Sequence, residues 1–172
     1  MVRIFSTFVV LVTSLIGSLN VMADEEELPF LLDLSQLNLK ISASEVVDSV
    51  GDFMSGSISA KGEKNKLVKV TLTGSLPSPS KITLKSNDFM AISEIKGSTF
   101  VMGKNSVAIH INGIWTLESS KENTFGVTTV LLREAGPITI KVAFILPQDV
   151  NEFFVSYPAL VSGKVNLSGA HK

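Results

Sequence analysis

Apolar and polar residues alternate along most of the chain from Leu28 onward, in short runs separated by Gly, Pro, Asn, Asp and Ser. This two-residue period is typical of strands that bury one face. The longest row runs from Ile138 to Leu146, with Thr139 and Lys141 on its other face, and predicts a central strand. Further rows predict strands at Leu37–Ile41, Val68–Leu72, Ile82–Leu84, Val107–Ile111, Phe153–Tyr157 and Val165–Leu167.

The run Val127–Leu132 differs from the others because it is apolar on both faces for part of its length. A strand with this pattern is either buried on both sides or lies at an edge that a neighbour covers. We therefore expect Val127–Leu132 to be a covered strand.

Turn signals separate the rows. Asn112-Gly113 between apolar residues predicts a tight hairpin, since both positions tolerate a positive φ. The segment Gly74–Ser80 separates two of the rows, because neither Pro77 nor Pro79 can lie inside a central strand. The segment Leu28–Leu37 has room for a helical turn or two, whereas Gly51 and two adjacent valines favour extended or irregular chain over Glu45–Asp52.

Taken together, the rows and turns predict an all-β fold, an antiparallel immunoglobulin-like β-sandwich of about seven to nine strands. We expect the β-sandwich domain to span residues 37–168, after an acidic N-terminal segment at 24–36 that begins Asp24-Glu25-Glu26-Glu27. A polar, mobile loop is expected at Lys61–Lys66.

The first 23 residues read as a cleavable signal peptide. Arg3 provides the basic start, Ile4–Val12 the apolar stretch and Val21-Met22-Ala23 the cleavage cue. An uncleaved membrane anchor is the alternative, but Ser, Thr and Asn interrupt the apolar stretch and acids follow it where a basic stop signal is expected. No Cys lies near the cleavage site, which excludes a lipid-anchored lipoprotein. We expect a secreted or periplasmic protein with no stable membrane insertion after cleavage.

The amino-acid composition limits the classes of partner that the protein can be expected to bind. Arg3 is the only charged residue of the signal peptide, so 14 basic and 16 acidic residues remain after cleavage, a net charge of −2. A near-neutral chain with scattered lysines argues against nucleic-acid binding. The absence of Cys fits a domain large enough to bury its own core, and it is commoner in bacterial than in eukaryotic exported proteins.

Residues able to carry chemistry are few. A Ser-His-Asp set needs a placed histidine, yet His171 is next to the C-terminus and His110 occupies an outward strand position, where a plain surface histidine is expected. One internal His and no Cys cannot supply a usual zinc site. Met54, Met90 and Met102 are spread over three segments and are expected to fill core gaps rather than to bind copper.

The remaining candidates are acids, one tryptophan and a sequon. A glycoside hydrolase needs two carboxylates facing each other, which a sequence cannot show. Trp115 could form a sugar platform, but we expect it in the core. Asn166-Leu167-Ser168 is a glycosylation sequon only in a eukaryotic host. We predict no catalytic, cofactor-binding or metal residues and no cofactor; the acids considered are Asp88, Glu94, Glu118, Glu122, Glu134, Asp149 and Glu152.

Three stretches, Leu67–Gly74, Ile82–Phe89 and Val142–Val150, resemble uncharacterised bacterial extracellular proteins with an immunoglobulin-like sandwich. The resemblance covers about Leu67 to Leu167 and implies that topology and an exported setting, with no reaction and no functional residue. Cysteine-protease inhibitors with a similar sandwich carry Gly-rich and Arg-Pro loop motifs, which this sequence lacks.

We therefore expect a non-enzymatic exported binding or interaction module with an unknown protein or glycan partner, bound through loops at one end. One alternative is a structural or assembly subunit that associates through strand edges. A carbohydrate-active enzyme is the least favoured alternative.

Overall fold

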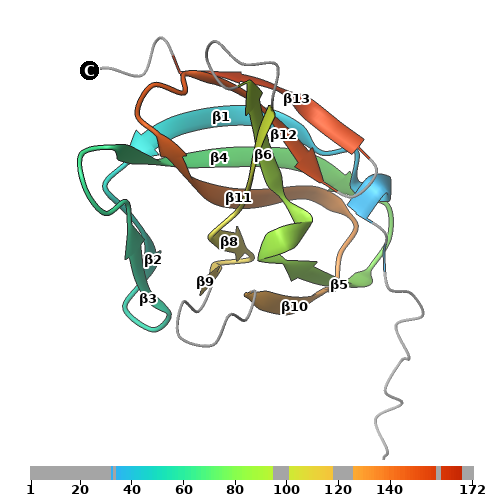
Figure 1. The fold of residues 1–172 in the computed structure, drawn as a ribbon. Coiled ribbons are helices and arrows are strands. Elements are labelled where there is room, and N and C mark those ends of the chain that lie inside the picture. The colour runs from blue at the N-terminus through green and yellow to red at the C-terminus, as the bar shows by residue number, and fades with distance from the viewer. Residues whose placement is uncertain (1–31, 33, 95–100, 118–125, 158–159, 168–172) are drawn as a thin grey trace, which may run out of the picture.

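The computed structural model describes residues 32, 34–94, 101–117, 126–157 and 160–167, and within them the protein is all-β with antiparallel pairing throughout (Figure 1). The expected signal peptide at 1–23 and the acids Asp24–Glu27 lie outside these residues. No helix of the described residues has the length and apolar character needed to cross a membrane. The elements are η1 (Leu34–Leu37), β1 (Lys40–Val47), β2 (Ser49–Asp52), β3 (Gly56–Ser59), β4 (Asn65–Leu76), β5 (Ser80–Lys85), η2 (Ser86–Asp88), β6 (Met90–Glu94), β7 (Val101–Asn105), β8 (Ala108–Ile111), β9 (Ile114–Leu117), β10 (Val127–Leu132), β11 (Gly136–Pro147), β12 (Glu152–Tyr157) and β13 (Leu160–Asn166).

The strands form two layers. One layer is a five-stranded sheet in the order β1-β4-β11-β8-β9. The other contains a four-stranded sheet, β13-β12-β6-β7, and the pair β10-β5, while β2 and β3 form a separate hairpin. Figure 1 shows this hairpin projecting from the body at the lower left. The predicted central strand is confirmed, because β11 pairs with β4 on one side and β8 on the other.

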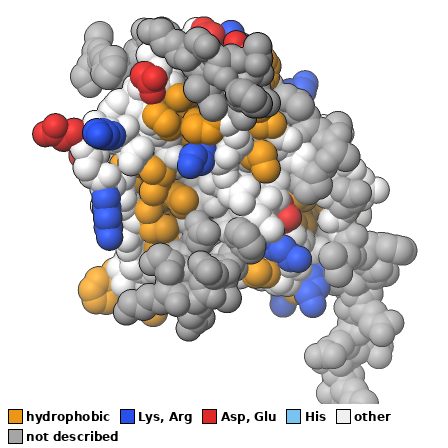
Figure 2. All heavy atoms as spheres, viewed as in Figure 1, with side chains coloured by type: hydrophobic (Ala, Val, Ile, Leu, Met, Phe, Trp, Pro, Cys, Tyr) orange, Lys and Arg blue, Asp and Glu red, His pale blue; other side chains and the backbone are white. Residues whose placement is uncertain are grey.

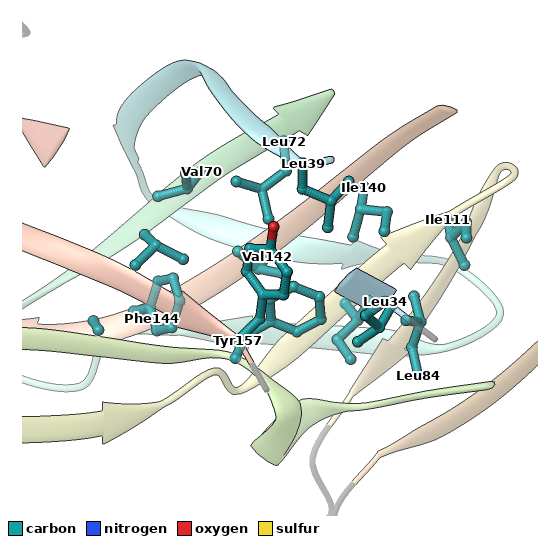
Figure 3. Close-up of a cluster of buried hydrophobic side chains, with 14 of the residues drawn as sticks. Leu34, Leu39, Val70, Leu72, Leu84, Ile111, Ile140, Val142, Phe144 and Tyr157 are labelled. Atoms are coloured by element: carbon teal, nitrogen blue, oxygen red, sulfur yellow. The ribbon is translucent and has the colours of Figure 1, made fainter. Parts of the chain in front are cut away.

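The main core fills the space between the layers. Alternate residues of β4, β8 and β11 meet alternate residues of β5, β6, β12 and β13 there, as the two-residue period predicts. Figure 3 shows Phe144 and Tyr157 among the aliphatic side chains. The rings of Phe144 and Phe153 contact each other edge-on, with their centroids 6.1 Å apart. The fully buried large side chains are Leu37, Leu67, Leu72, Ile82, Leu84, Phe89, Ile109, Ile111, Ile140, Phe144, Leu146 and Phe153.

A second, smaller apolar cluster involves the β2–β3 hairpin. Val50 of the hairpin is buried with Leu67, Ala108 and Ala143, whose strands belong to the five-stranded sheet. Along β11, Ala143 alternates with Val142 and Phe144 of the main core, so this cluster lies on the opposite face of the sheet. The five-stranded sheet is therefore buried on both faces where the hairpin covers it.

Three sequence expectations about the fold are corrected. The described residues contain thirteen strands rather than seven to nine, because short hairpins such as β2–β3 and β8–β9 divide the chain more finely. Leu37 belongs to η1, since Asn38 adopts a φ of 49° and the strand starts only at Lys40. Val127–Leu132 forms β10 but is not covered on both faces: Val127 is 54% and Leu131 42% exposed.

Of the other expectations, two are confirmed and one holds in part. The hairpin at Asn112-Gly113 joins β8 to β9, and both residues have the positive φ, 49° and 81°, that a two-residue type I′ turn requires. The segment Glu45–Asp52 is extended, in β1 and β2. The loop expected at Lys61–Lys66 ends earlier, because Lys66 is a buried residue of β4.

Candidate functional site

The tip of the β2–β3 hairpin presents two large apolar side chains to solvent. Phe53 is 101% and Met54 90% exposed, more than any other large hydrophobic residue that the structure describes. Figure 2 shows hydrophobic side chains at the lower left of the molecule, toward the end of this hairpin. A single exposed apolar residue is ordinary, but two adjacent ones at the end of a projecting element indicate a contact surface.

The tip is held in one conformation by Asp52. Its Oδ1 accepts hydrogen bonds from the backbone N–H groups of Met54 (2.9 Å) and Ser55 (2.7 Å) and from Ser55 Oγ (2.8 Å). These donors, Ser55 first, lower the pKa of the Asp52 carboxyl below its ordinary 3.8. An aspartate that bonds backbone groups two and three residues ahead fixes a turn. Phe53 and Met54 are therefore exposed on an ordered turn.

The hairpin is attached to the body through β9. The backbone N–H of Trp115 makes a smaller contribution to the lowered pKa of the Asp52 carboxyl. The Trp115 side chain packs on the second cluster and against the ring of His110, with ring centroids 4.9 Å apart. This contact ties the turn geometry at Asp52 to strands β8 and β9.

His110 is half-buried and contributes to this support. Its Nδ1 is buried without a hydrogen-bond partner, and burial lowers the pKa of the imidazole below 6.5, helped by the positive charge of Lys141. The residue is on the predicted outward face of β8, and it is half-buried because the ring of Trp115 packs against it. The His110 ring therefore packs against Trp115, which in turn packs on the second cluster.

A cavity of about 570 Å³ lies at the end of the four-stranded sheet. It is bounded by β6, β7, β12 and the turn after β11, and it brings together three of the seven acids considered from sequence, Glu94, Asp149 and Glu152. Its apolar lining includes Ile92, Met102, Pro147, Val150, Phe153 and Phe154.

Buried Lys66 fixes one wall of this cavity. Its Nζ donates to the backbone oxygen of Gln148 at 3.0 Å and to Asn151 Oδ1 at 2.9 Å, which ties β4 to the turn between β11 and β12. Burial lowers the pKa of Lys66 below 10.5, and Asp149 opposes that shift. The lysine thus serves the turn and is not free for a ligand.

The carboxylates at the cavity are in a different environment from the buried general acid of a glycoside hydrolase. Glu94, Asp149 and Glu152 are all exposed, whereas the general acid of such an enzyme lies in an apolar pocket. Glu152 Oε2 is also bonded to Lys164 Nζ at 2.6 Å, and its Oε1 accepts from Asn166 Nδ2 at 3.2 Å. This arrangement suits solvated charges at a cavity mouth.

Several residues considered from sequence are not where they were expected. The expectation that the methionines fill core gaps is wrong: Met54 is at the hairpin tip, Met90 is 36% exposed and Met102 borders the cavity. Trp115 lies in the second cluster instead of the main core. Glu118, Glu122, His171 and Ser168 of the sequon are outside the described residues, and no group of three His, Asp or Glu suited to a metal ion occurs within them.

Phe53 is the residue that the sequence interpretation missed. The signal was present: a Phe-Met pair between Gly51 and Gly56, beside an Asp and a Ser that favour a turn. Large apolar side chains at the tip of a turn have few neighbours to bury them, so their position in the sequence already indicates exposure.

Comparisons with known proteins leave the site to be interpreted from its geometry. No family model, no curated protein and no solved structure matches this chain.

Proposed function

We propose that the protein is a non-enzymatic exported interaction module that binds a protein partner through the tip of the β2–β3 hairpin. The observation that carries the proposal is the pair Phe53 and Met54, exposed on a turn that Asp52 holds in place. Burying each such side chain against a partner stabilises a complex by about 1.5–3 kcal/mol. Because the turn is already ordered, binding does not spend that free energy on arranging it.

Charge favours a protein over a lipid surface as the partner. The hairpin and its flanks, residues 48–59, contain Asp48 and Asp52 but no Lys or Arg. Peripheral binding to anionic membranes normally relies on basic residues beside the apolar ones. An apolar pocket with a neutral or basic rim on another protein fits this tip better.

Export and the finer fold class belong to the same proposal. The sequence of residues 1–23 supports a cleaved signal peptide, and mass spectrometry of the secreted or periplasmic protein should give a mature N-terminus at Asp24. A full-length chain retained in the membrane would contradict export. Two antiparallel layers, with long strand β11 inside one of them, support an immunoglobulin-like sandwich.

Affinity capture from an envelope extract tests the interaction. The wild-type domain should retain a defined protein, and the double variant Phe53→Ser/Met54→Ser should lose it while its circular dichroism spectrum stays unchanged. Phe154→Ser is the matched control, because Phe154 is an exposed phenylalanine (45%) beside the cavity. Loss of the partner with Phe154→Ser, or retention by the double variant, would refute binding through the hairpin tip.

A further inference from the structure

Strand β10 carries two apolar side chains on its outward face that the described part of the chain leaves about half-exposed. Its inward residues Thr128 and Val130 are buried, whereas outward Val127 and Leu131 are 54% and 42% exposed. β10 pairs with β5 alone among the described strands, so its second edge has no strand neighbour there. All six residues from Val127 to Leu132 are uncharged and have high β-propensity apart from the leucines, which marks an edge open to pairing.

The ladder with β5 shows which backbone groups face that edge. Ser86 N–H donates to the Gly126 oxygen at 2.9 Å, one residue pair beyond Val127↔Lys85, so Gly126 and Ser86 form a hydrogen-bonded pair. Hydrogen-bonded pairs alternate along an antiparallel ladder. Thr128 and Val130 therefore direct their backbone groups at β5, and Val127, Thr129 and Leu131 direct theirs away.

The Thr83–Thr129 pair agrees with this assignment. Their Oγ1 atoms lie 3.0 Å apart, as expected for a non-hydrogen-bonded pair, in which side chains approach most closely. The N–H and C=O groups of Thr129 thus lie in the middle of the open edge.

We propose that this edge pairs with the same edge of a second copy of the chain, about a two-fold axis at Thr129. An antiparallel β10–β10 pair with Thr129 opposite Thr129 places Val127 of each copy opposite Leu131 of the other. These residues then exchange the backbone hydrogen bonds that the edge leaves open. The two β10–β5 pairs become one continuous four-stranded sheet.

The side-chain pattern of β10 favours a second copy of the chain as the strand that pairs with this edge. The outward row reads apolar, threonine, apolar, so it matches itself when reversed, as a two-fold interface requires. The pairing brings apolar residues opposite each other and threonine opposite threonine, with no charge on either strand. A strand of another protein would not need this symmetry.

Charge substitution on the two-fold axis gives the direct test. Sedimentation velocity from micromolar to millimolar concentration should show the mature wild-type protein passing from monomer to dimer. Thr129→Lys and Thr129→Glu should each weaken dimerisation roughly tenfold or more, because like charges then lie opposite each other. A mixture of the two variants should form a one-to-one heterodimer. Thr139→Lys, on an exposed position of β11, is the control and should dimerise like wild type.

A cysteine test fixes the register, and the chain has no Cys of its own. Hydrogen-bonded partners in such a pair have Cα atoms about 5.5 Å apart, but their side chains are farther apart than a disulfide requires, so a short bifunctional thiol crosslinker is the suitable probe. Thr129→Cys should give a covalent dimer with this crosslinker. Leu131→Cys alone should not, since the two Leu131 positions lie more than about 10 Å apart, but Leu131→Cys mixed with Val127→Cys should.

Several outcomes would overturn the pairing. A wild-type protein that stays monomeric, open-ended aggregates instead of dimers, or dimers that survive both charge variants would each do so. The pairing is independent of the hairpin: Phe53→Ser/Met54→Ser should leave dimerisation unchanged, and Thr129→Lys should leave partner capture unchanged.

Discussion

Gly74 shows how closely η1 packs against β4. A Cβ built on Gly74 would overlap the backbone oxygen of Leu37, which cannot move aside as a flexible side chain can, and would lie 2.9 Å from Leu39 Cδ2. We predict that Gly74→Ala lowers the free energy of unfolding by about 1–3 kcal/mol, measured by urea denaturation.

Gly103 provides the matched control for that substitution. A Cβ there would meet the Sδ of Met90 at 2.8 Å, the end of a flexible and partly exposed side chain. Gly103→Ala should leave the free energy of unfolding unchanged or raise it by up to about 1 kcal/mol. Equal losses in the two variants would contradict the close approach of Leu37.

His110 should make stability depend on pH. Because burial lowers its pKa in the folded state, the unfolded chain takes up a proton near pH 6.5 that the folded protein does not. The free energy of unfolding should therefore be greatest above that pH and fall as the pH drops below it. Asp52, with a pKa below 3.8, adds its own loss only in stronger acid.

Urea titrations between neutral and mildly acid pH measure this dependence. His110→Gln removes the titrating group at similar size, so its free energy of unfolding should vary less with pH than that of the wild type. If the free energy of unfolding varied with pH identically in the two proteins, burial would not be lowering the pKa of His110.

At the scale of elements, the β2–β3 hairpin depends on one carboxylate. Asp52→Ala removes the acceptor for the Met54 and Ser55 N–H groups and for Ser55 Oγ, while the second cluster around Val50 remains. We predict faster hydrogen exchange at the Met54 and Ser55 amides with little change in β4 and β11. Asp48→Ala is the control, and equal exchange in both variants would contradict the role of Asp52.

Which elements could be predicted from the sequence follows from how each one is buried. β4, β5, β11 and β12 bury one face in the main core, so strict alternation identified them. The β2–β3 hairpin packs on the outer face of a sheet through Val50 and Ile58 among Ser and Gly residues, too few apolar positions to form a row. The hairpin and its exposed tip were therefore not predicted.

Long-range polar contacts were also beyond sequence reasoning. Lys66 looks like part of a charged loop, yet it is buried because Gln148 and Asn151, 82 and 85 residues away, accept its hydrogen bonds. No local pattern contains that pairing. The gathering of Glu94, Asp149 and Glu152 at one cavity depends in the same way on the fold.

Among the described strands, β10 has an open edge that its sequence pattern did not predict. Its pattern predicted a strand covered by a neighbour, and the described residues supply none on its outer edge. A second copy paired along this edge, as we propose, would supply the missing neighbour.

At the scale of the whole molecule, the two layers form a packed scaffold, and the projecting hairpin carries the exposed tip that we propose as the contact surface. The layers are joined by one main core, whereas the hairpin is held by the second cluster and by Asp52. A rigid body with a preformed apolar tip is suited to non-covalent binding of a partner.

Photo-crosslinking at the hairpin tip tests the central claim most directly. Benzoylphenylalanine in place of Phe53 keeps the aromatic character of the tip and reacts with whatever lies against it. In cells that make the protein, it should give an adduct with one defined protein, and adding Met54→Ser should abolish the adduct. The same probe at Glu63, in an exposed turn between β3 and β4, should give none. Absence of an adduct at position 53, or the same adduct at 53 and 63, would contradict binding through the tip.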